Sequence, residues 1–251
     1  METEMYRLTY LSEEALWWYF GMDQLTELLI EQDHHLHRLE VLDAGCGTGG
    51  MMKQLARYGR VTGFDLSPVA LEFCRERQLT RLARASTTAL PFRSNSFDLV
   101  TSFDVLTSIP VTAHAGIFDE FARVLKPGGH VLVRAAAYDW IRGGHDRASH
   151  VVYRYRRSQL TRALQAAGFL VERSTYANAF LLPVAIAKRI WEARHGQPER
   201  TEVRSDFWMP PALLNRAMAG VLHFENLLIR RRVTLPVGLS VVAIARLAGR
   251  E

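Results

Sequence analysis

The sequence contains very little cysteine: only Cys46 and Cys74 occur among its 251 residues. Two cysteines cannot build a disulfide scaffold, and their scarcity is typical of proteins from a reducing compartment. The N-terminus also lacks the basic segment and apolar run of a signal peptide. We therefore expect a cytoplasmic location.

Long apolar runs and a strong excess of one charge are missing as well. The longest apolar stretch in the C-terminal third, residues 180–187, is far shorter than the about 20 residues of a membrane-spanning helix. The net charge is +5, and the basic clusters at 154–157 and 230–232 are interpreted as surface charge, so that nucleic-acid binding is disfavoured. With 48% apolar and 23% charged residues, the composition is that of a globular protein with a core.

Short apolar runs alternate with helical segments over much of the chain. Strands are predicted at 39–43, 61–65, 97–102, 130–135, 169–175 and 237–245, and helices at 51–58, 68–77, 117–125, 159–167, 183–194 and 210–232. Ser67 is suited to cap the second helix, and Pro68 fits the first turn of that helix. This alternation predicts βαβ units, and hence an α/β fold with a mostly parallel sheet.

A glycine-rich segment, Gly45-Cys46-Gly47-Thr48-Gly49-Gly50, follows the first predicted strand. Its spacing satisfies G-x-G-x-x-G, and Asp65 ends the next strand, where a carboxylate can accept hydrogen bonds from two ribose hydroxyls. The acid before the glycines decides between ligands. Asp43 would repel the pyrophosphate of a dinucleotide, whereas it suits a ligand that carries an ammonium and a sulfonium. An NAD-dependent oxidoreductase is therefore disfavoured.

Four motifs occur in a fixed order: VLDAGCGTGG (41–50), GFDLS (63–67), ALPFRSNSFDLV (89–100) and RVLKPGG (123–129). In this order they resemble the class I S-adenosylmethionine-dependent methyltransferases of the small-molecule type. The resemblance implies S-adenosylmethionine as cofactor and a doubly wound, Rossmann-like, seven-stranded sheet.

The resemblance also implies roles for individual residues. Gly45, Cys46, Gly47 and Gly49 would surround the methionine part of the cofactor, Asp43 would face its ammonium, Asp65 would hold the ribose, Leu66 would pack on the adenine and Phe103 would lie near the methionine chain. The family often has an acid that contacts the adenine amino group. This chain has Ser86 there, which offers only a neutral hydrogen bond. The Glu-His pair that relatives often carry after the fourth strand is replaced by Thr107 and Ser108.

We expect one methyltransferase domain over residues 1–251. Its parts are an N-terminal lid helix (1–35), a core (36–179), a helical insertion (180–232) and the last strand (233–251).

The acceptor site is expected beyond the carboxyl ends of the strands. The segment 138–150 leaves that edge, and His145 is the candidate base, with Asp146 or His150 as its partner; a loop with solvated histidines is the equally weighted alternative. Tyr138 and His150 are candidate acceptor contacts. Trp17 or Trp18 would form part of the lid, or would only dock the N-terminal helix on the domain.

The insertion offers an apolar face that includes Leu213, Val221 and Phe224, followed by Arg230 to Arg232. It is interpreted as the roof of an apolar acceptor pocket, with a dimer contact or a rest on a membrane surface as alternatives. The expected acceptor is a small or lipid-like molecule with an apolar body, methylated at oxygen or nitrogen. The oligomeric state is left open.

The sequence gives less support to a metal site, to a reactive cysteine and to other functions. A metal site is not expected at Asp33-His34-His35-Leu36-His37, because no second ligand cluster accompanies it, and Cys46 has no base partner that would activate it. An RNA methyltransferase is the nearest alternative, although the Asn/Asp-Pro-Pro-Tyr/Phe motif of base-methylating enzymes is absent. A non-catalytic S-adenosylmethionine-binding protein also remains open, since methyl transfer requires no fixed catalytic residue.

Overall fold

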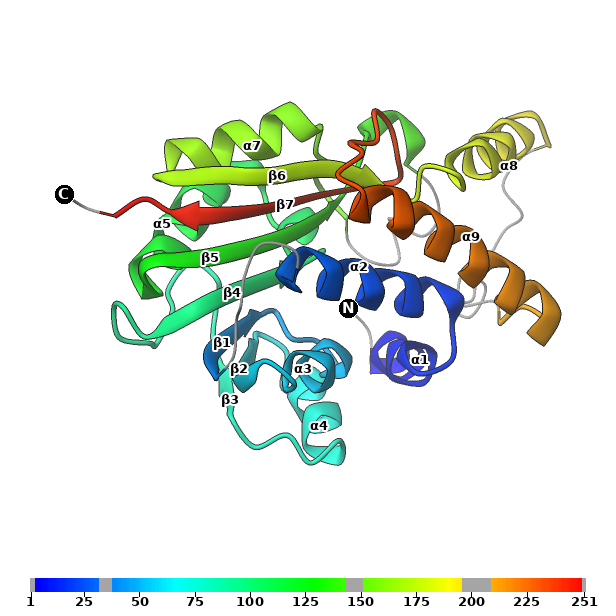
Figure 1. The fold of residues 1–251 in the computed structure, drawn as a ribbon. Coiled ribbons are helices and arrows are strands. Elements are labelled where there is room, and N and C mark those ends of the chain that lie inside the picture. Colours follow the sequence, from blue (N-terminus) through cyan, green and yellow to red (C-terminus); the bar gives the residue numbers. More distant parts are fainter. Residues whose placement is uncertain (1–2, 32–37, 143–150, 196–208, 250–251) are drawn as a thin grey trace.

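The structure is a computed structural model that describes residues 3–31, 38–142, 151–195 and 209–249. A seven-stranded sheet forms its centre, in the order β3-β2-β1-β4-β5-β7-β6 (Figure 1). The strands are β1 (Leu39–Ala44), β2 (Gly59–Asp65), β3 (Leu82–Arg84), β4 (Phe97–Phe103), β5 (Leu125–Ala136), β6 (Phe169–Ala177) and β7 (Ser240–Leu247). β7 runs antiparallel to β5 and β6, and all other pairs are parallel. The predicted doubly wound, mostly parallel α/β fold is confirmed.

Two strands differ from the prediction. The edge strand β3 comprises only Leu82–Arg84, which is too short to show a period in the sequence. β5 begins at Leu125, because the Lys126-Pro127-Gly128-Gly129 turn lies inside the strand as a bulge. The register with β4 accordingly jumps from Leu125 to His130.

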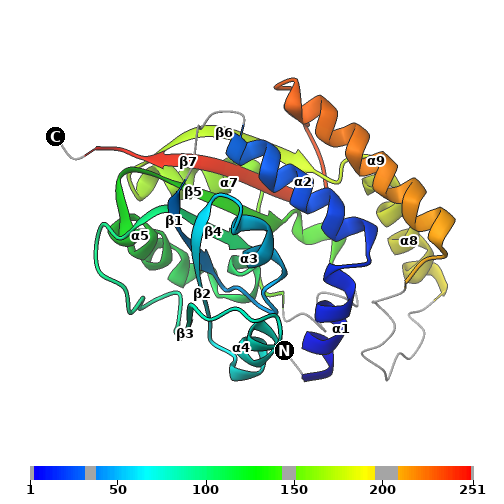
Figure 2. The same ribbon diagram turned by 60° about the horizontal axis from the view of Figure 1, so that its bottom comes forward.

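Helices cover both faces of the sheet. The connecting helices are α3 (Gly50–Leu55), α4 (Pro68–Glu76), α5 (His114–Val124) and α7 (Arg157–Ala166), and the peripheral ones are α1 (Thr3–Glu13), α2 (Trp17–Glu31), α8 (Leu182–His195) and α9 (Ala212–Arg230). Figures 1 and 2 together place α2, α3 and α9 on one face and α5 and α7 on the other. Ser67 caps α4 as predicted, its side chain accepting a hydrogen bond from the N–H of Ala70.

The N-terminal segment forms two helices, where the sequence led us to expect one lid helix. The backbone N–H groups of Ala15 and Leu16 both bond to the carbonyl of Ser12, which ends α1 in a turn. Asn215 of α9 then fixes the junction, since its Oδ1 accepts from the N–H of Trp17 at 3.0 Å and its Nδ2 donates to the carbonyl of Ala15 at 2.9 Å. A residue about 200 positions away therefore sets where α2 begins.

The insertion is held on the domain by α9. Leu222 packs directly over Gly21 of α2, where a Cβ atom would lie 2.2 Å from the leucine Cδ1. The buried carboxylate of Glu225 accepts hydrogen bonds from three successive backbone N–H groups, those of Asn178, Ala179 and Phe180. These bonds place the insertion at the carboxyl end of β6, the edge of the sheet at which parallel strands bind ligands.

Candidate active site

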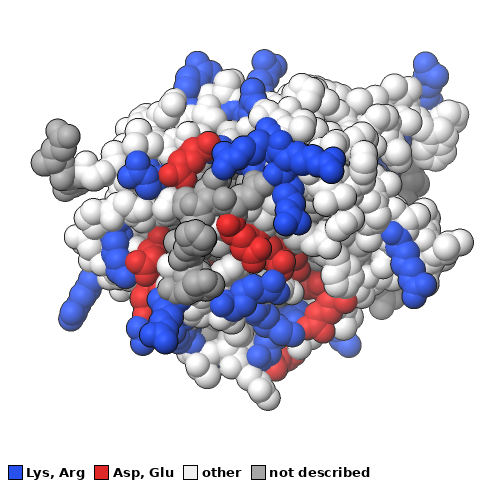
Figure 3. All heavy atoms as spheres, viewed as in Figure 1, with Lys and Arg blue, Asp and Glu red and all other residues white. Residues whose placement is uncertain are grey.

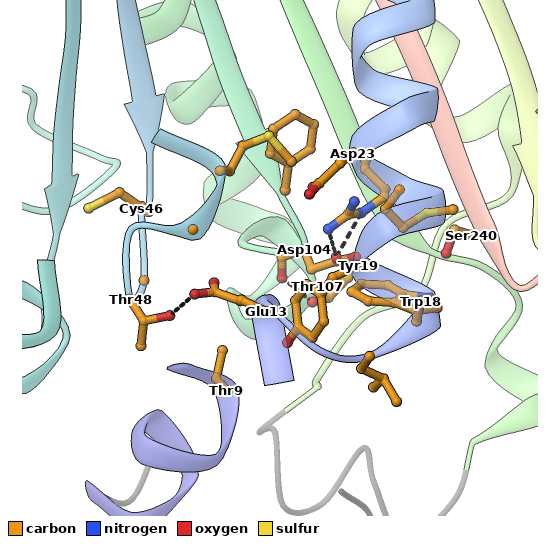
Figure 4. A pocket seen from close by; sticks show the side chains of 18 of the residues that line it. Thr9, Glu13, Trp18, Tyr19, Asp23, Cys46, Thr48, Asp104, Thr107 and Ser240 are labelled. Carbon is orange, nitrogen blue, oxygen red and sulfur yellow. Dashed lines mark hydrogen bonds and ion pairs between the residues drawn. The ribbon is translucent and has the colours of Figure 1, made fainter. Parts of the chain in front are cut away.

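The carboxyl ends of β1 and β4 border a cavity of about 720 Å³ (Figure 4). Its walls come from the loop after β1, from α1 and α2, and from Lys188 of α8. Seven residues that the sequence predicted for the site line this cavity: Asp43, Gly45, Cys46, Gly47, Phe103, Trp17 and Trp18.

The glycine loop turns sharply over the end of β1. Gly45 has φ 76°, and a Cβ at this position would lie 2.3 Å from the side chain of Val105, so only glycine fits. Gly47 has φ 53°, and no atom lies within 4 Å of where its Cβ would be. The backbone at Gly47 is therefore open to close approach by a ligand. Asp65 holds this turn, because its Oδ2 accepts from the N–H of Gly47 at 3.0 Å.

Asp43 is a buried carboxylate at the end of β1. Its side chain accepts one hydrogen bond from the hydroxyl of Thr101 at 2.8 Å, and no ion pair of Asp43 occurs among the described residues. Burial raises the pKa of Asp43 to about 7, and the Thr101 hydrogen bond opposes this effect. A cationic ligand beside the glycine loop would supply the charge partner that the described residues do not.

A comparison with known protein families concerns the part of the chain that contains the glycine loop. Residues 42–133, which run from β1 into β5 and include the glycine loop, match the family model described as a methyltransferase domain. Over these residues the chain is similar to methyltransferase domains, which agrees with the resemblance of its four motifs to the class I S-adenosylmethionine-dependent methyltransferases.

Two curated relatives and one solved structure illustrate what this methyltransferase domain is similar to. Cycloartenol-C-24-methyltransferase of Arabidopsis thaliana is 35% identical over 114 residues, covering 40% of this chain and 31% of the relative. Demethylmenaquinone methyltransferase of Tropheryma whipplei (strain Twist) is 40% identical over 98 residues, covering 38% of this chain and 40% of the relative. The chain therefore spans well under half the length of both relatives.

The solved structure supports the fold. Geranyl diphosphate C-methyltransferase from Streptomyces coelicolor A3(2) superposes with a TM-score of 0.56 and 18% identity, over 89% of this chain and 77% of that one. At this identity, the likeness concerns the arrangement of the sheet and its helices.

The cavity of the methyltransferase domain fits S-adenosylmethionine in charge and in shape. The buried carboxylate of Asp43 matches a cationic ligand, and the open backbone at Gly47 admits close contact. Asp65 keeps lone pairs for ribose hydroxyls, since each carboxylate oxygen accepts two hydrogen bonds and the structure uses one on each, from Gly47 and from Ser67.

The helix α1, part of the expected N-terminal lid, closes one wall of the cavity through side chains that the sequence did not single out. The carboxylate of Glu13 accepts from the hydroxyl of Thr48 at 2.6 Å and from the guanidinium of Arg77 at 2.9 Å. Arg77 also donates to the carbonyls of Thr48 and Tyr10. This buried cluster, which we call the α1 latch (Glu13, Thr48 and Arg77), joins the N-terminal helix to the glycine loop.

Arg134 lies on the opposite wall, at the end of β5. It forms an ion pair with Asp104 at 2.8 Å, and its guanidinium lies 4.8 Å from the ring of Trp18 and 5.0 Å from that of Phe103. The cation thereby ties Trp18 of the predicted lid to Phe103 of the predicted cofactor site.

Asp23 of α2 is a site residue that sequence reasoning missed. Figure 4 shows its carboxylate projecting into the cavity, and no hydrogen bond or ion pair of Asp23 occurs within the described ranges. Burial raises the pKa of Asp23 to about 6, and the nearby charge of Arg134 opposes this effect. An unpartnered carboxylate with this pKa can accept a proton near neutral pH.

Several predicted site residues lie elsewhere. Asp65, Leu66, Ser86 and Gly49 are not among the residues that line the cavity, and Leu66 is largely exposed. Tyr138 stacks on Tyr176, with ring centroids 5.1 Å apart, and does not line the cavity either. Their roles remain predictions.

Other predicted residues fall in segments that the structure does not describe. His145, Asp146 and His150 lie in 143–150, and the stretch from His34 to His37 lies in 32–37. Among the residues that are described, no three metal-ligating side chains come together, and no helix is long and apolar enough to cross a bilayer.

The pocket-roof interpretation of α9 does not agree with the structure. No residue of α9 lines the cavity, and Leu213 and Phe224, which were expected to face the acceptor, are 82% and 55% exposed. The apolar face of this helix points away from the domain, because its other face, with Leu222, Glu225 and Asn226, packs on α2 and on the segment that follows β6.

The role of Asp65 can be tested directly. We expect Asp65→Ala to weaken S-adenosylmethionine binding by about 1.5–3 kcal/mol, the range for a hydrogen bond to a charged group. Titration calorimetry measures the change, with Glu72→Ala on the exposed side of α4 as the control. A folded Asp65→Ala variant with parental affinity would remove Asp65 from the site.

Proposed function

We propose that the protein transfers a methyl group from S-adenosylmethionine to a small or lipid-like acceptor with an apolar body, at oxygen or nitrogen. The methyltransferase domain and the cavity at its sheet edge support the reaction type. The acceptors in the names of the two relatives, cycloartenol and demethylmenaquinone, support the acceptor class.

One observation carries the choice of cofactor. Asp43 is a buried carboxylate without an ion-pair partner in the described part of the chain, and it lies directly before the glycine loop. Such a group attracts an ammonium or a sulfonium, and it repels the pyrophosphate that a dinucleotide would place there.

The residues of the cavity have simple tasks in this reaction. When bound, S-adenosylmethionine supplies a methyl group on a positively charged sulfur. Asp43 and the glycine loop would hold the cofactor, and Trp18 and α1 would exclude water from the reacting atoms. Asp23 would accept the proton that an oxygen or nitrogen acceptor loses. His145 is the alternative proton acceptor.

The role of Asp23 predicts a pH dependence. A base with a pKa of about 6 is protonated below that pH, so the rate should fall as the pH drops through 6. Asp23→Asn should lower kcat by about 10²- to 10⁴-fold and remove this acidic limb, while KM changes little. Glu72→Gln, an exposed acid on α4 that is not among the groups that shift the pKa of Asp23, is the control and should leave kcat and the pH profile unchanged. An unchanged kcat and pH profile in Asp23→Asn would assign the proton transfer to another group.

The proposed function itself is tested by finding a product. The protein is incubated with S-adenosylmethionine carrying an isotope-labelled methyl group and with fractions of a cell extract, and labelled products are identified by mass spectrometry. We expect label in a small apolar molecule, and the position of the label identifies the methylated atom. Label in RNA, with binding that weakens steeply as salt rises, would overturn the acceptor class.

A further inference from the structure

The helix α9 buries two polar residues and exposes several large apolar ones. Glu225 and Asn226 are buried, and Asn226 donates to the carbonyl of Gly21 at 2.8 Å. The outward face carries Leu213, Leu214, Val221, Phe224 and Leu227, all of which are exposed. A helix on the surface of a monomeric protein in water normally shows the opposite arrangement.

The apolar surface continues from α9 onto α8. The rings of Phe224 and Phe180 are 5.8 Å apart, which connects the face of α9 to the segment that leads into α8. On α8, Val184, Ile190 and Trp191 are exposed. We call the exposed apolar residues of 180–191 and 213–227 the outer face; its members are Phe180, Val184, Ile190, Trp191, Leu213, Leu214, Val221, Phe224 and Leu227.

Exposed cations flank the outer face. Arg216 and Arg230 of α9, Arg231 after it, and Lys188 and Arg194 of α8 are exposed cations. Of the two acids on these helices, Glu225 is buried against backbone N–H groups, and the side chain of Glu192 lies outside what the structure describes. Figure 3 accordingly shows the right-hand part of the molecule, over α8 and α9, as white with isolated blue side chains.

We propose that the outer face docks on a membrane that contains anionic lipids. Exposed leucine, phenylalanine and tryptophan side chains flanked by arginine and lysine are the pattern of helices that lie in the membrane interface. Anionic head groups match the cations, and the acyl region takes up the apolar side chains.

The outer face also adjoins the cavity. Lys188 lines the cavity and Trp191 belongs to the outer face, and the two lie three residues apart on α8. A docked protein would therefore hold the cavity close to the lipid, which suits a lipid-like acceptor; this last point rests on the proposed function.

Flotation with vesicles tests the proposal without any need for methyl transfer. Vesicles of phosphatidylcholine alone and of phosphatidylcholine with phosphatidylglycerol are mixed with the full chain at low and at high salt. We expect binding to the anionic vesicles, weakened by salt. Each removed cation lowers vesicle affinity about fivefold, so Arg216→Gln should show that loss. Leu213→Asp with Phe224→Asp should abolish binding.

Val111→Asp, which changes an exposed apolar residue outside the outer face, is the matched control and should bind like the parent. Thermal unfolding and cofactor calorimetry on each variant separate a lost surface from a lost fold or a failed cofactor assignment. Parental binding by the double variant would overturn the proposal. So would a parent that ignores anionic vesicles at low salt, or one that forms a dimer through Leu213 and Phe224 instead.

Discussion

Asp43→Asn is expected to weaken S-adenosylmethionine binding about 10- to 150-fold, and at the same time to stabilise the empty protein. The asparagine keeps an oxygen that can accept the Thr101 hydrogen bond, but it loses the charge that faces the cofactor cation. The same charge is costly in the empty protein, because it is buried without an ion-pair partner in the part of the chain that the structure describes.

The sign of the stability effect follows from the pKa. Burial raises the pKa of Asp43 from 3.8 to about 7, so the folded state binds a proton that the unfolded state has released. The stability contributed by this proton is fully present below pH 4 and is lost as the pH rises through 7. Each unit by which burial raises the pKa corresponds to about 1.4 kcal/mol. At pH 8, Asp43→Asn should therefore increase the free energy of unfolding by roughly 2–4 kcal/mol.

Urea unfolding of the empty protein between pH 4 and pH 8 measures this effect, and calorimetry measures the cofactor. Asp119→Asn, an exposed acid on α5, is the control and should change neither quantity. Part of the pH dependence should persist in Asp43→Asn, because burial also raises the pKa of Asp23. If Asp43→Asn were no more stable than the parent at pH 8, the carboxylate would not be buried as described.

Arg77→Ala is expected to destabilise the protein by about 3–5 kcal/mol and to release α1 from the glycine loop. The guanidinium is buried and contacts Glu13, Glu14 and two backbone carbonyls. Its removal leaves the carboxylate of Glu13 buried, with Thr48 as its remaining hydrogen-bond donor among the side chains of the α1 latch. Unfolding in urea gives the free energy, and limited proteolysis reports whether α1 has detached.

The control for this prediction is an exposed arginine, Arg57, which has one carboxylate partner where Arg77 has two. Arg57 pairs with Glu27 at the surface, so Arg57→Ala should cost less than about 1 kcal/mol. Equal losses in the two variants, or an α1 that stays resistant to protease in Arg77→Ala, would show that the α1 latch does not hold the helix.

The sequence was sufficient to predict the part of the site whose residues lie close together in the chain. Asp43, the glycines and Asp65 lie within 23 consecutive residues, counted from 43 to 65, and each turn residue has a recognisable conformational reason. Their positions at the end of β1 and β2 could therefore be predicted. The strand β3 was missed because three residues carry no periodic signal.

The rest of the site depends on tertiary contacts. Glu13, Thr48 and Arg77 come from three distant parts of the chain, and Asp23 lies on a helix whose orientation is fixed by α9. The apolar stripe of α9 was visible in the sequence, but periodicity does not say which way a stripe points. The direction is set by Glu225 and Asn226 on the other face. Their hydrogen-bond partners lie on other elements, so the sequence of α9 alone does not reveal them.

The central claim is that this chain binds S-adenosylmethionine at the glycine loop beside Asp43. Titration calorimetry of the purified protein with S-adenosylmethionine, S-adenosylhomocysteine and NAD tests it most directly. We expect micromolar binding of S-adenosylmethionine or its demethylated product, about 10- to 150-fold weaker binding in Asp43→Asn, and far weaker binding of NAD to the parent. Tight binding of NAD, with no heat from S-adenosylmethionine or S-adenosylhomocysteine, would contradict the claim.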